Sequence, residues 1–327
     1  MTDVNLGELV TTTLRARSPV LADNVSDNTA LLSRLKQRGK VKTFGGGRTI
    51  VEPLEYAENG TYTRYTGYEQ LNISPSSIID AAEYAIKQAA IAVTMSGLEQ
   101  LQNAGAAQLI DWMEARIGNA ERTFLNNLSA DIYSDGTADG GKQIGGLQLL
   151  IADDPTTGTV GGINRASWSF WQNQLYDFSS PPSGFSATAA SKTTIQPAMN
   201  YMYLACSRNR DNVDLIVADN TYFRYYWESL QANQRFTNDS MAQAGFMNLK
   251  FMNADVVFDG GQGGDAPSAH MYFLNTNYIL YRPHADRNMV PLSPDRYATN
   301  QDAIVKLIGW AGNMTLRNAA LQGVIHA

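Results

Sequence analysis

Residues 96–136 constrain the fold of this chain more than any other stretch, because they predict one long, uninterrupted amphipathic helix. Apolar residues recur there mostly at steps of three or four, which places them along one face, while most charged residues fall elsewhere. Ser96 and Glu99 form a capping-box pattern at the start, and Asp135-Gly136 marks the end. Roughly 36 helical residues at about 1.5 Å each span about 54 Å, so we expect a structural spine. The apolar positions are Leu98, Leu101, Leu109, Met113, Ile117, Ala120, Phe124, Leu128 and Ile132.

Composition excludes several classes of protein. The 327 residues allow one large domain or two, and 44% hydrophobic with 17% charged residues is an ordinary globular balance. The net charge of -6 argues against a dedicated nucleic-acid reader. A single cysteine, Cys206, rules out an intrachain disulfide framework and fits a reducing compartment. The N-terminus has no signal-peptide pattern, and no run of about 18 apolar residues predicts a membrane span.

The first 43 residues have the composition of an arm. Two short helices are predicted, at residues 2–17 and 27–39, with Ser18-Pro19 as the break between them. A basic run with no acid between its members begins within the second predicted helix and extends past it, and two interpretations stay open for it. It is either a solvated face or an inward-facing contact with the nucleic-acid backbone, which needs charge but no base recognition. Its members are Arg34, Lys36, Arg38, Lys40 and Lys42.

Residues 48–73 predict a long β-hairpin. They are rich in Thr, Val, Ile and Tyr, and Asn59-Gly60 in the middle is a strong turn signal. Each arm of about 10 residues reaches roughly 30 Å, and Pro75 marks the return. Because a two-stranded ribbon is marginal alone in water, we expect it to lie on another subunit. The expected inter-subunit contacts are Tyr56, Asn59, Gly60, Tyr62, Tyr65 and Tyr68.

The remainder predicts an α+β chain. Residues 90–95 alternate as a strand that leads into the spine helix. Residues 147–290 predict a mixed domain, in which helices at 193–206 and after Asp219 or Asn220 are combined with apolar strands. These strands are expected at residues 213–218, 248–258, 270–274 and 278–281. We expect residues 303–310 and 314–325 to form a closing pair of strands, with residues 311–313 as their turn.

Two glycine-rich loops partly match three ligand-binding motifs, and turns explain them better. Residues 136–142 match the start of a phosphate-binding loop, but Gln143 replaces the Ser or Thr that holds Mg²⁺, and the loop follows a helix. Residues 131–142 lack oxygen ligands at two positions of a calcium loop, Tyr133 and Lys142. Residues 261–266 match a dinucleotide fingerprint loosely, but a strand follows instead of a helix. We therefore expect no cofactor at these loops.

Titratable residues predict no catalytic or metal site either. Cys206 lies on an apolar helix face, which indicates a core residue rather than a nucleophile. Asp153-Asp154 lies in a turn-rich segment, and turn chemistry explains the pair. The aromatic-rich segment 222–227 contains only one basic residue, Arg224, so packing of its rings against other protein is favoured over stacking on nucleic-acid bases. The histidines lack metal-ligand spacing and cysteine partners: they are His270, His284 and His326.

The order of these elements resembles that of the major capsid proteins of tailed double-stranded DNA phages. These proteins have the Johnson fold, which is shared with the herpesvirus capsid floor. Four segments also resemble the amino-acid sequences of one family of these capsid proteins: SPVLADNVSDNTALL at 18–32, VEPLEYAENGTYTRYTGYE at 51–69, NNLSADIYSDGT at 126–137 and QIGGLQLLI at 143–151. The resemblance spans nearly the whole chain and rests on extent and order, not on catalytic motifs.

The resemblance implies a domain plan. Residues 1–43 are an N-terminal arm and residues 44–80 an extended hairpin loop over a neighbour. A peripheral domain combines residues 81–145, which contain the spine helix, with residues 300–327, and an axial domain covers residues 146–299. Some relatives crosslink through a lysine on the hairpin loop, but residues 43–80 contain none, so we do not expect that chemistry. Residues 1–43 are too short for the long cleaved scaffolding segment of other relatives, which we expect to be absent or already removed.

The resemblance also implies the function. The implied function is that of a structural protein without enzyme activity, which forms the hexamers and pentamers of an icosahedral head. This protein would assemble in the bacterial cytoplasm and remain in the virion. The implied partners are further copies of the chain, a scaffolding protein, a portal, a cementing or decoration protein, and double-stranded DNA bound non-specifically, with no membrane. Two other functions stay open: a phosphate- or nucleotide-binding enzyme using residues 136–142, and a β-rich tail or adhesin protein. The long helix and the lack of repeats argue against the second.

Overall fold

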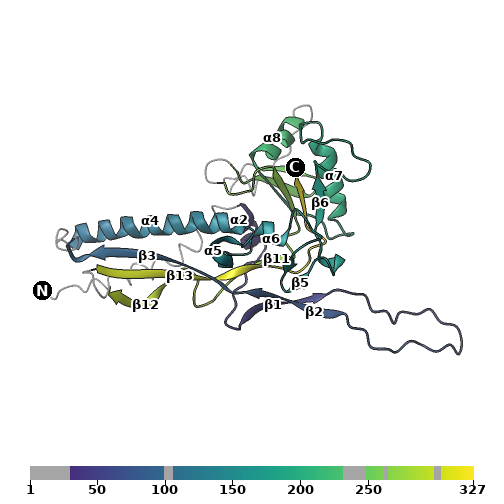
Figure 1. The fold of residues 1–327 in the computed structure, drawn as a ribbon, viewed down its shortest axis with the longest axis horizontal. Helices are drawn as coiled ribbons and strands as arrows, with labels where there is room; N and C mark the ends of the chain where they lie inside the picture. The colour runs from purple at the N-terminus through teal and green to yellow at the C-terminus, as the bar shows by residue number, and fades with distance from the viewer. Residues whose placement is uncertain (1–29, 99–105, 231–247, 261–263, 298–302) are drawn as a thin grey trace.

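A computed structural model describes residues 30–98, 106–230, 248–260, 264–297 and 303–327. A long helix lies over a layer of strands, a second sheet with two helices rises at one end, and a hairpin extends beyond both (Figure 1). In chain order the elements are α2 (Ala30–Gln37), β1 (Thr49–Glu55), β2 (Ile79–Ala85), β3 (Lys87–Ser96), α4 (Ala106–Ile132), α5 (Ala138–Gly141), α6 (Leu147–Leu150), β4 (Thr159–Val160), β5 (Ile163–Asn164), η1 (Ser169–Trp171), β6 (Gln174–Asp177), α7 (Ile195–Ala205), β7 (Leu215–Ala218), α8 (Asn220–Ser229), β8 (Asn248–Phe251), β9 (Ala254–Phe258), β10 (His270–Leu274), β11 (Ile279–Pro283), β12 (Val290–Tyr297), β13 (Ala303–Leu316) and β14 (Gly323–His326).

Helix α4 confirms the predicted spine over 27 residues, a length of about 40 Å. Helical backbone already begins directly after Ser96, and residues 99–105, with Glu99 and Leu101, lie outside the described residues. The apolar face is buried where the period predicts it, but Leu98 is 64% exposed and does not belong to it. The side chains of Leu109 and Met113 also lie outside the described part of the chain. The buried positions are Ile117, Ala120, Phe124, Leu128 and Ile132.

A sheet of four strands lies beneath the spine. Strand β13 is its centre and pairs with β11 and β12 on one side and with β3 on the other. The antiparallel register of β3 runs from Lys87 opposite Gly312 to Ser96 opposite Ala303. In Figure 1, β3 lies between α4 and β13, and the strand and the helix lie lengthwise beside each other with opposite chain directions. The predicted strand at 90–95 is therefore confirmed and is longer than expected.

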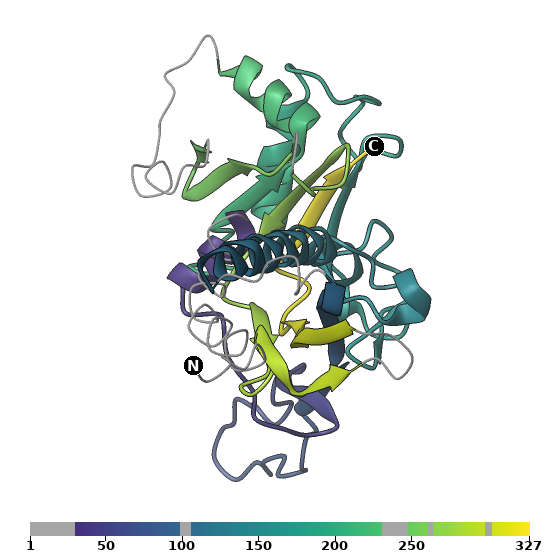
Figure 2. The same cartoon turned by 90° about the vertical axis from the view of Figure 1, so that its left-hand side faces the viewer.

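The second sheet has six strands in the order β6-β14-β10-β7-β9-β8. Alternate residues of each strand point to opposite faces. In β7, Ile216 and Ala218 pack with α7 and α8, whereas Leu215 and Val217 pack with α2, α6 and the end of α4. Because both faces are covered, β7 is apolar at every position, as a doubly buried strand requires. Figure 2 shows this body on one side of α4, with β12, β13 and the hairpin on the other.

The predicted closing pair of strands is wrong. Residues 303–316 form one strand of 14 residues, and no turn occurs at 311–313. Gly312 lies opposite both Pro283 and Lys87, so its backbone is paired within the sheet, and a Cβ there would lie 2.6 Å from the Arg282 carbonyl oxygen. The glycine therefore permits a close approach of strands and does not make a turn.

The expected domain boundaries also differ from the sheets. Strand β14 belongs to residues 300–327 but lies between β6 and β10 in the six-stranded sheet. Strands β11 and β12 belong to residues 146–299 but pair with β13 under the spine. The chain thus crosses between the two bodies more often than the continuous range 146–299 implies, because pairing partners are chosen by sheet packing and not by position in the chain.

The predicted hairpin is paired only at its base. Strands β1 and β2 pair from Thr49 opposite Ala85 to Glu55 opposite Ile79, so the return strand lies beyond residue 73, where the prediction ended. Residues 56–78, which we call the outer loop, contain no strand and extend away from the body (Figure 1). Asn59 does form a local turn, since its Oδ1 accepts from the Thr61 backbone N–H at 3.0 Å. The turn depends on residues next to it in the chain, whereas hydrogen-bonded pairing of the two strands persists only where they pack against the rest of the protein.

Candidate assembly surface

A buried carboxylate fastens the hairpin base to the sheet under the spine. Glu52 of β1 is 1% exposed, and Arg317 and Arg282 lie 2.7 Å and 3.4 Å from its oxygens. The Thr315 hydroxyl donates to the same carboxylate at 3.1 Å. A buried charge is tolerated only when it is paired and hydrogen-bonded, and these partners meet that need. The direction of the hairpin is therefore set by β11 and β13.

A second attachment comes from β2. The Tyr84 hydroxyl donates to the Leu316 carbonyl at 2.9 Å and lies 3.1 Å from the Leu316 backbone N–H, which donates to it. Burial raises the pKa of Tyr84, so the phenol stays protonated. The Glu83 N–H donates to the Gly161 carbonyl at 2.9 Å, and a Cβ on Gly161 would lie 2.8 Å from the Ala82 Cβ. Hairpin and body thus fit closely at this point.

The outer loop presents apolar side chains to solvent. Tyr62 is 77% exposed, Tyr68 is 106% exposed and Ile73 is 91% exposed. Several large exposed apolar side chains on one loop are typical of a protein interaction surface. Of the expected contact residues, Asn59, Gly60, Tyr62, Tyr65 and Tyr68 are exposed on this loop, while Tyr56 is partly buried. Their contact with another subunit stays a prediction.

Tyr56 belongs to an aromatic cluster that sequence reasoning missed. Its ring lies 5.8 Å from that of Trp168 and 5.7 Å from that of Phe170. Together with Asp80 they line a pocket of about 250 Å³ at the base of the outer loop, and Trp168 is 48% exposed. The tetrapeptide Trp-Ser-Phe-Trp at 168–171 was the available signal, but nothing in it indicates a partner some hundred residues earlier.

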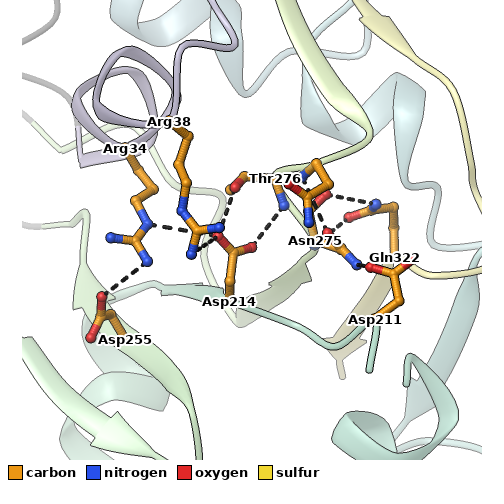
Figure 3. A network of polar contacts seen from close by, with 9 residues as sticks. Arg34, Arg38, Asp211, Asp214, Asp255, Asn275, Thr276 and Gln322 are labelled. Atoms are coloured by element: carbon orange, nitrogen blue, oxygen red, sulfur yellow. Dashed lines mark hydrogen bonds and ion pairs between the residues drawn. The ribbon is translucent and has the colours of Figure 1, made fainter. Parts of the chain in front are cut away.

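The two arginines of the basic run make ion pairs within the chain. Arg34 lies 3.4 Å from Asp255 and 3.7 Å from Asp214, and Arg38 lies 3.1 Å from Asp214. The Asp214 carboxylate also accepts from the Thr276 hydroxyl at 2.6 Å (Figure 3). These contacts hold α2 against β7 and β9, a role that sequence reasoning did not predict.

The same network continues at the ends of β10 and β14. The Asn275 side chain donates to Asp211 at 2.6 Å, and its backbone N–H donates to Gln322 at 2.9 Å (Figure 3). Lys36 and Lys42 are exposed and Lys40 is half-buried, so for the lysines a contact with DNA stays a prediction.

The glycine-rich loop at 136–142 has the geometry of a turn. Gly136 has a φ of +74°, and the Asp139 backbone has a φ of 54°, so the chain reverses immediately after α4. Lys142 is exposed, and Gln143 donates to Asp131 at 2.7 Å. A phosphate-binding loop follows a strand, whereas this one follows a helix, so a nucleotide site is not supported.

The carboxylate pair at 153–154 divides into two roles. Asp154 accepts from the Thr156 backbone N–H at 3.0 Å, as turn chemistry predicts. Asp153 instead contacts His270 at 3.1 Å, a pairing that the sequence did not indicate. Burial lowers the pKa of His270, but hydrogen bonds, above all that with Asp153, produce a net rise; the pKa of Asp153 is lowered despite partial burial. Cys206 is buried in the core, and burial raises the pKa of its thiol.

Within the described ranges, the structure contains no group of three or more His, Cys, Asp or Glu residues able to hold a metal ion. None of the helices in the described part of the chain has the length and apolar character needed to cross a lipid bilayer.

This architecture defines a fold: the chain has the Johnson fold found in tailed-phage capsid proteins, as its resemblance implied. A chain of the cyanophage A-1(L) capsid asymmetric unit superposes with a TM-score of 0.64 at 14% identity, covering 88% of this chain and 90% of that one. A chain of the capsid of the empty GTA particle gives 0.54 at 13% identity, covering 88% and 94%. A chain of Mycobacterium phage Bobi gives 0.52 at 12% identity, covering 88% and 89%.

No protein-family model and no curated protein sequence matches this chain. At identities this low, the structural likeness establishes the fold alone. The comparisons support neither the enzyme nor the adhesin alternative.

Proposed function

We propose that this chain is the structural subunit of an icosahedral phage head. It associates into hexamers and pentamers that close around double-stranded DNA, and it carries out no catalysis. One observation carries the proposal: a loop rich in exposed aromatic and aliphatic residues is held at its base by the buried Glu52 cluster, on a fold shared with chains of phage capsids. Such a loop is costly for a solitary subunit and useful for one that lies on a neighbour.

Each of the two bodies has its own role in such a shell. The spine, β3 and β13 form the peripheral part of the tile, and the six-stranded sheet with α7 and α8 forms the axial part around five-fold and six-fold axes. Residues 44–80 lie over an adjacent copy. A shell under internal pressure gains strength from many moderate contacts per subunit, and arms that lie on neighbours add buried area without a larger core.

Other partners follow from the same role. A scaffolding protein, a portal and a decoration protein would meet the assembled shell, not a single catalytic pocket. The exposed lysines of the basic run, Lys36 and Lys42, would face packaged DNA and bind it without sequence preference. The subunit would assemble in the bacterial cytoplasm and remain in the virion.

Electron microscopy and analytical ultracentrifugation of the purified chain test the proposal. We expect closed shells, or uniform hexamers and pentamers, whose fraction rises with protein concentration. Deletion of residues 59–65 should leave a folded subunit that cannot close shells, because the deletion removes the centre of the outer loop and spares its base. A small monodisperse particle at every concentration contradicts the proposal, and normal shells from the deletion variant contradict the role of the loop.

A further inference from the structure

The pocket at the base of the outer loop has the chemistry of a cation receptor. Tyr56, Trp168 and Phe170 supply aromatic surfaces with ring centroids 5.7 to 5.9 Å apart, and Asp80 supplies a negative charge. Aromatic faces attract a guanidinium or ammonium group, and a carboxylate beside them adds an ion pair. At about 250 Å³ the pocket is smaller than typical small-molecule sites of about 300–1,000 Å³, so its size suits a single side chain.

Asp80 is available for such a contact. It is exposed on β2, and one of its oxygens accepts from the Ala81 backbone N–H at 2.8 Å. Among the residues that the structure describes, no ion pair involves Asp80. Trp168, at 48% exposed, leaves a large aromatic surface in water. Both groups gain from a cation that covers them.

The outer loop carries one basic residue, Arg64. Its guanidinium lies 5.6 Å from the centroid of the Tyr62 ring, so the loop presents a cation that already stacks on an aromatic side chain. The loop extends away from the body that holds the pocket (Figure 1), and Arg64 lies eight positions after Tyr56 in the chain. At roughly 3.3 Å per residue, this span reaches at most about 26 Å from the pocket's edge.

We infer that Arg64 of one copy enters the pocket of Tyr56, Trp168, Phe170 and Asp80 on the next copy. This inference rests on the proposed function and names the contact that joins adjacent subunits. The cation and its receptor lie at different places on one chain, so the contact is heterologous: each subunit gives its Arg64 to one neighbour and receives another from the opposite side. Head-to-tail contacts of this kind generate closed rings, which is the symmetry of pentamers and hexamers.

A charge exchange tests the inference in the full-length chain. Asp80→Arg and Arg64→Glu each place like charges together in the contact, and the double variant restores an opposite pair. We expect each single variant to raise the concentration for half-maximal assembly at least tenfold, measured by ultracentrifugation, and the double variant to recover most of that loss. Trp168→Ala should weaken assembly in the same direction, because it removes an aromatic face.

Two controls make the test specific. Glu58→Arg reverses an exposed charge near the pocket without lining it, so assembly should stay near the wild-type level. Arg64→Lys keeps the cation and should assemble better than Arg64→Glu. Circular dichroism and thermal melting of the unassembled variants establish that each one is folded.

The outcomes separate the inference from the proposed function. Wild-type shells together with unaffected single variants overturn the inference and leave the shell function standing. Impaired single variants with no recovery in the double variant also overturn it, because the two residues then act independently. A wild-type chain that never assembles overturns both. Reciprocal recovery in the double variant supports the pairing of Arg64 with Asp80.

Discussion

Glu52→Gln tests how the hairpin is held to the body. The carboxylate is 1% exposed and lies 2.7 Å from Arg317 and 3.4 Å from Arg282. The amide keeps the shape of the side chain but removes its charge, which leaves two guanidinium groups without their counter-ion. Breaking a buried ion pair costs about 3–5 kcal/mol, and Arg317, whose side chain is 35% exposed, recovers part of this through hydration. We therefore expect the free energy of unfolding to fall by about 3 kcal/mol.

Urea unfolding of the unassembled subunit measures this loss, and an unchanged m value indicates that the same surface unfolds. Glu55→Gln is the matched control, because Glu55 is exposed on the same strand; we expect its effect to stay within about 0.5 kcal/mol. Native-state hydrogen exchange should locate the destabilisation in β1 and β2. Equal free energies of unfolding for the two variants would refute the conclusion that the Glu52 cluster holds the hairpin.

Three further predictions follow from the described contacts. Gly161→Ala should lower the melting temperature more than Gly162→Ala, since both glycines have a positive φ but only the first would bring a Cβ to 2.8 Å from another side chain; equal shifts would contradict the clash. The stability that His270 contributes, measured against His270→Gln by urea unfolding, should be complete below about pH 6.5 and disappear as pH rises, because the pKa of His270 is raised in the folded state; a contribution that grows with pH would reverse the sign. Tyr62, Tyr65 and Tyr68 of the outer loop are exposed, so replacing all three by serine should change the unfolding free energy of the unassembled subunit by no more than about 0.5 kcal/mol. The same variant should form no shells in electron micrographs. Normal shells would show that these residues do not belong to the interface.

Sequence reasoning succeeded where the cause of a structure is local. The apolar period predicted α4, and of the two residues predicted to cap α8, Asp219 and Asn220, the structure has Asp219, whose Oδ1 accepts from the Tyr222 N–H at 2.9 Å. Strand β7 was predicted from its continuous apolar composition, which reflects burial on both faces.

It failed where a residue's role depends on a distant partner. The Ala311-Gly312-Asn313 segment has a turn composition, yet it runs straight through β13 because strands pair with it on both sides. The hairpin arms were predicted from propensity alone, and the structure pairs them only where the body supports them.

The sequence by itself determined the spine helix, its end near Gly136, the α+β class and the lysine-free outer loop, since these follow from neighbours within a few residues or from composition. Only the tertiary structure decided that Glu52 meets Thr315 and Arg317, which lie 263 and 265 positions away along the chain, and that β14 leaves β13 for the other sheet. Such contacts are selected when whole elements pack and bury their charges together, and no local pattern encodes that choice.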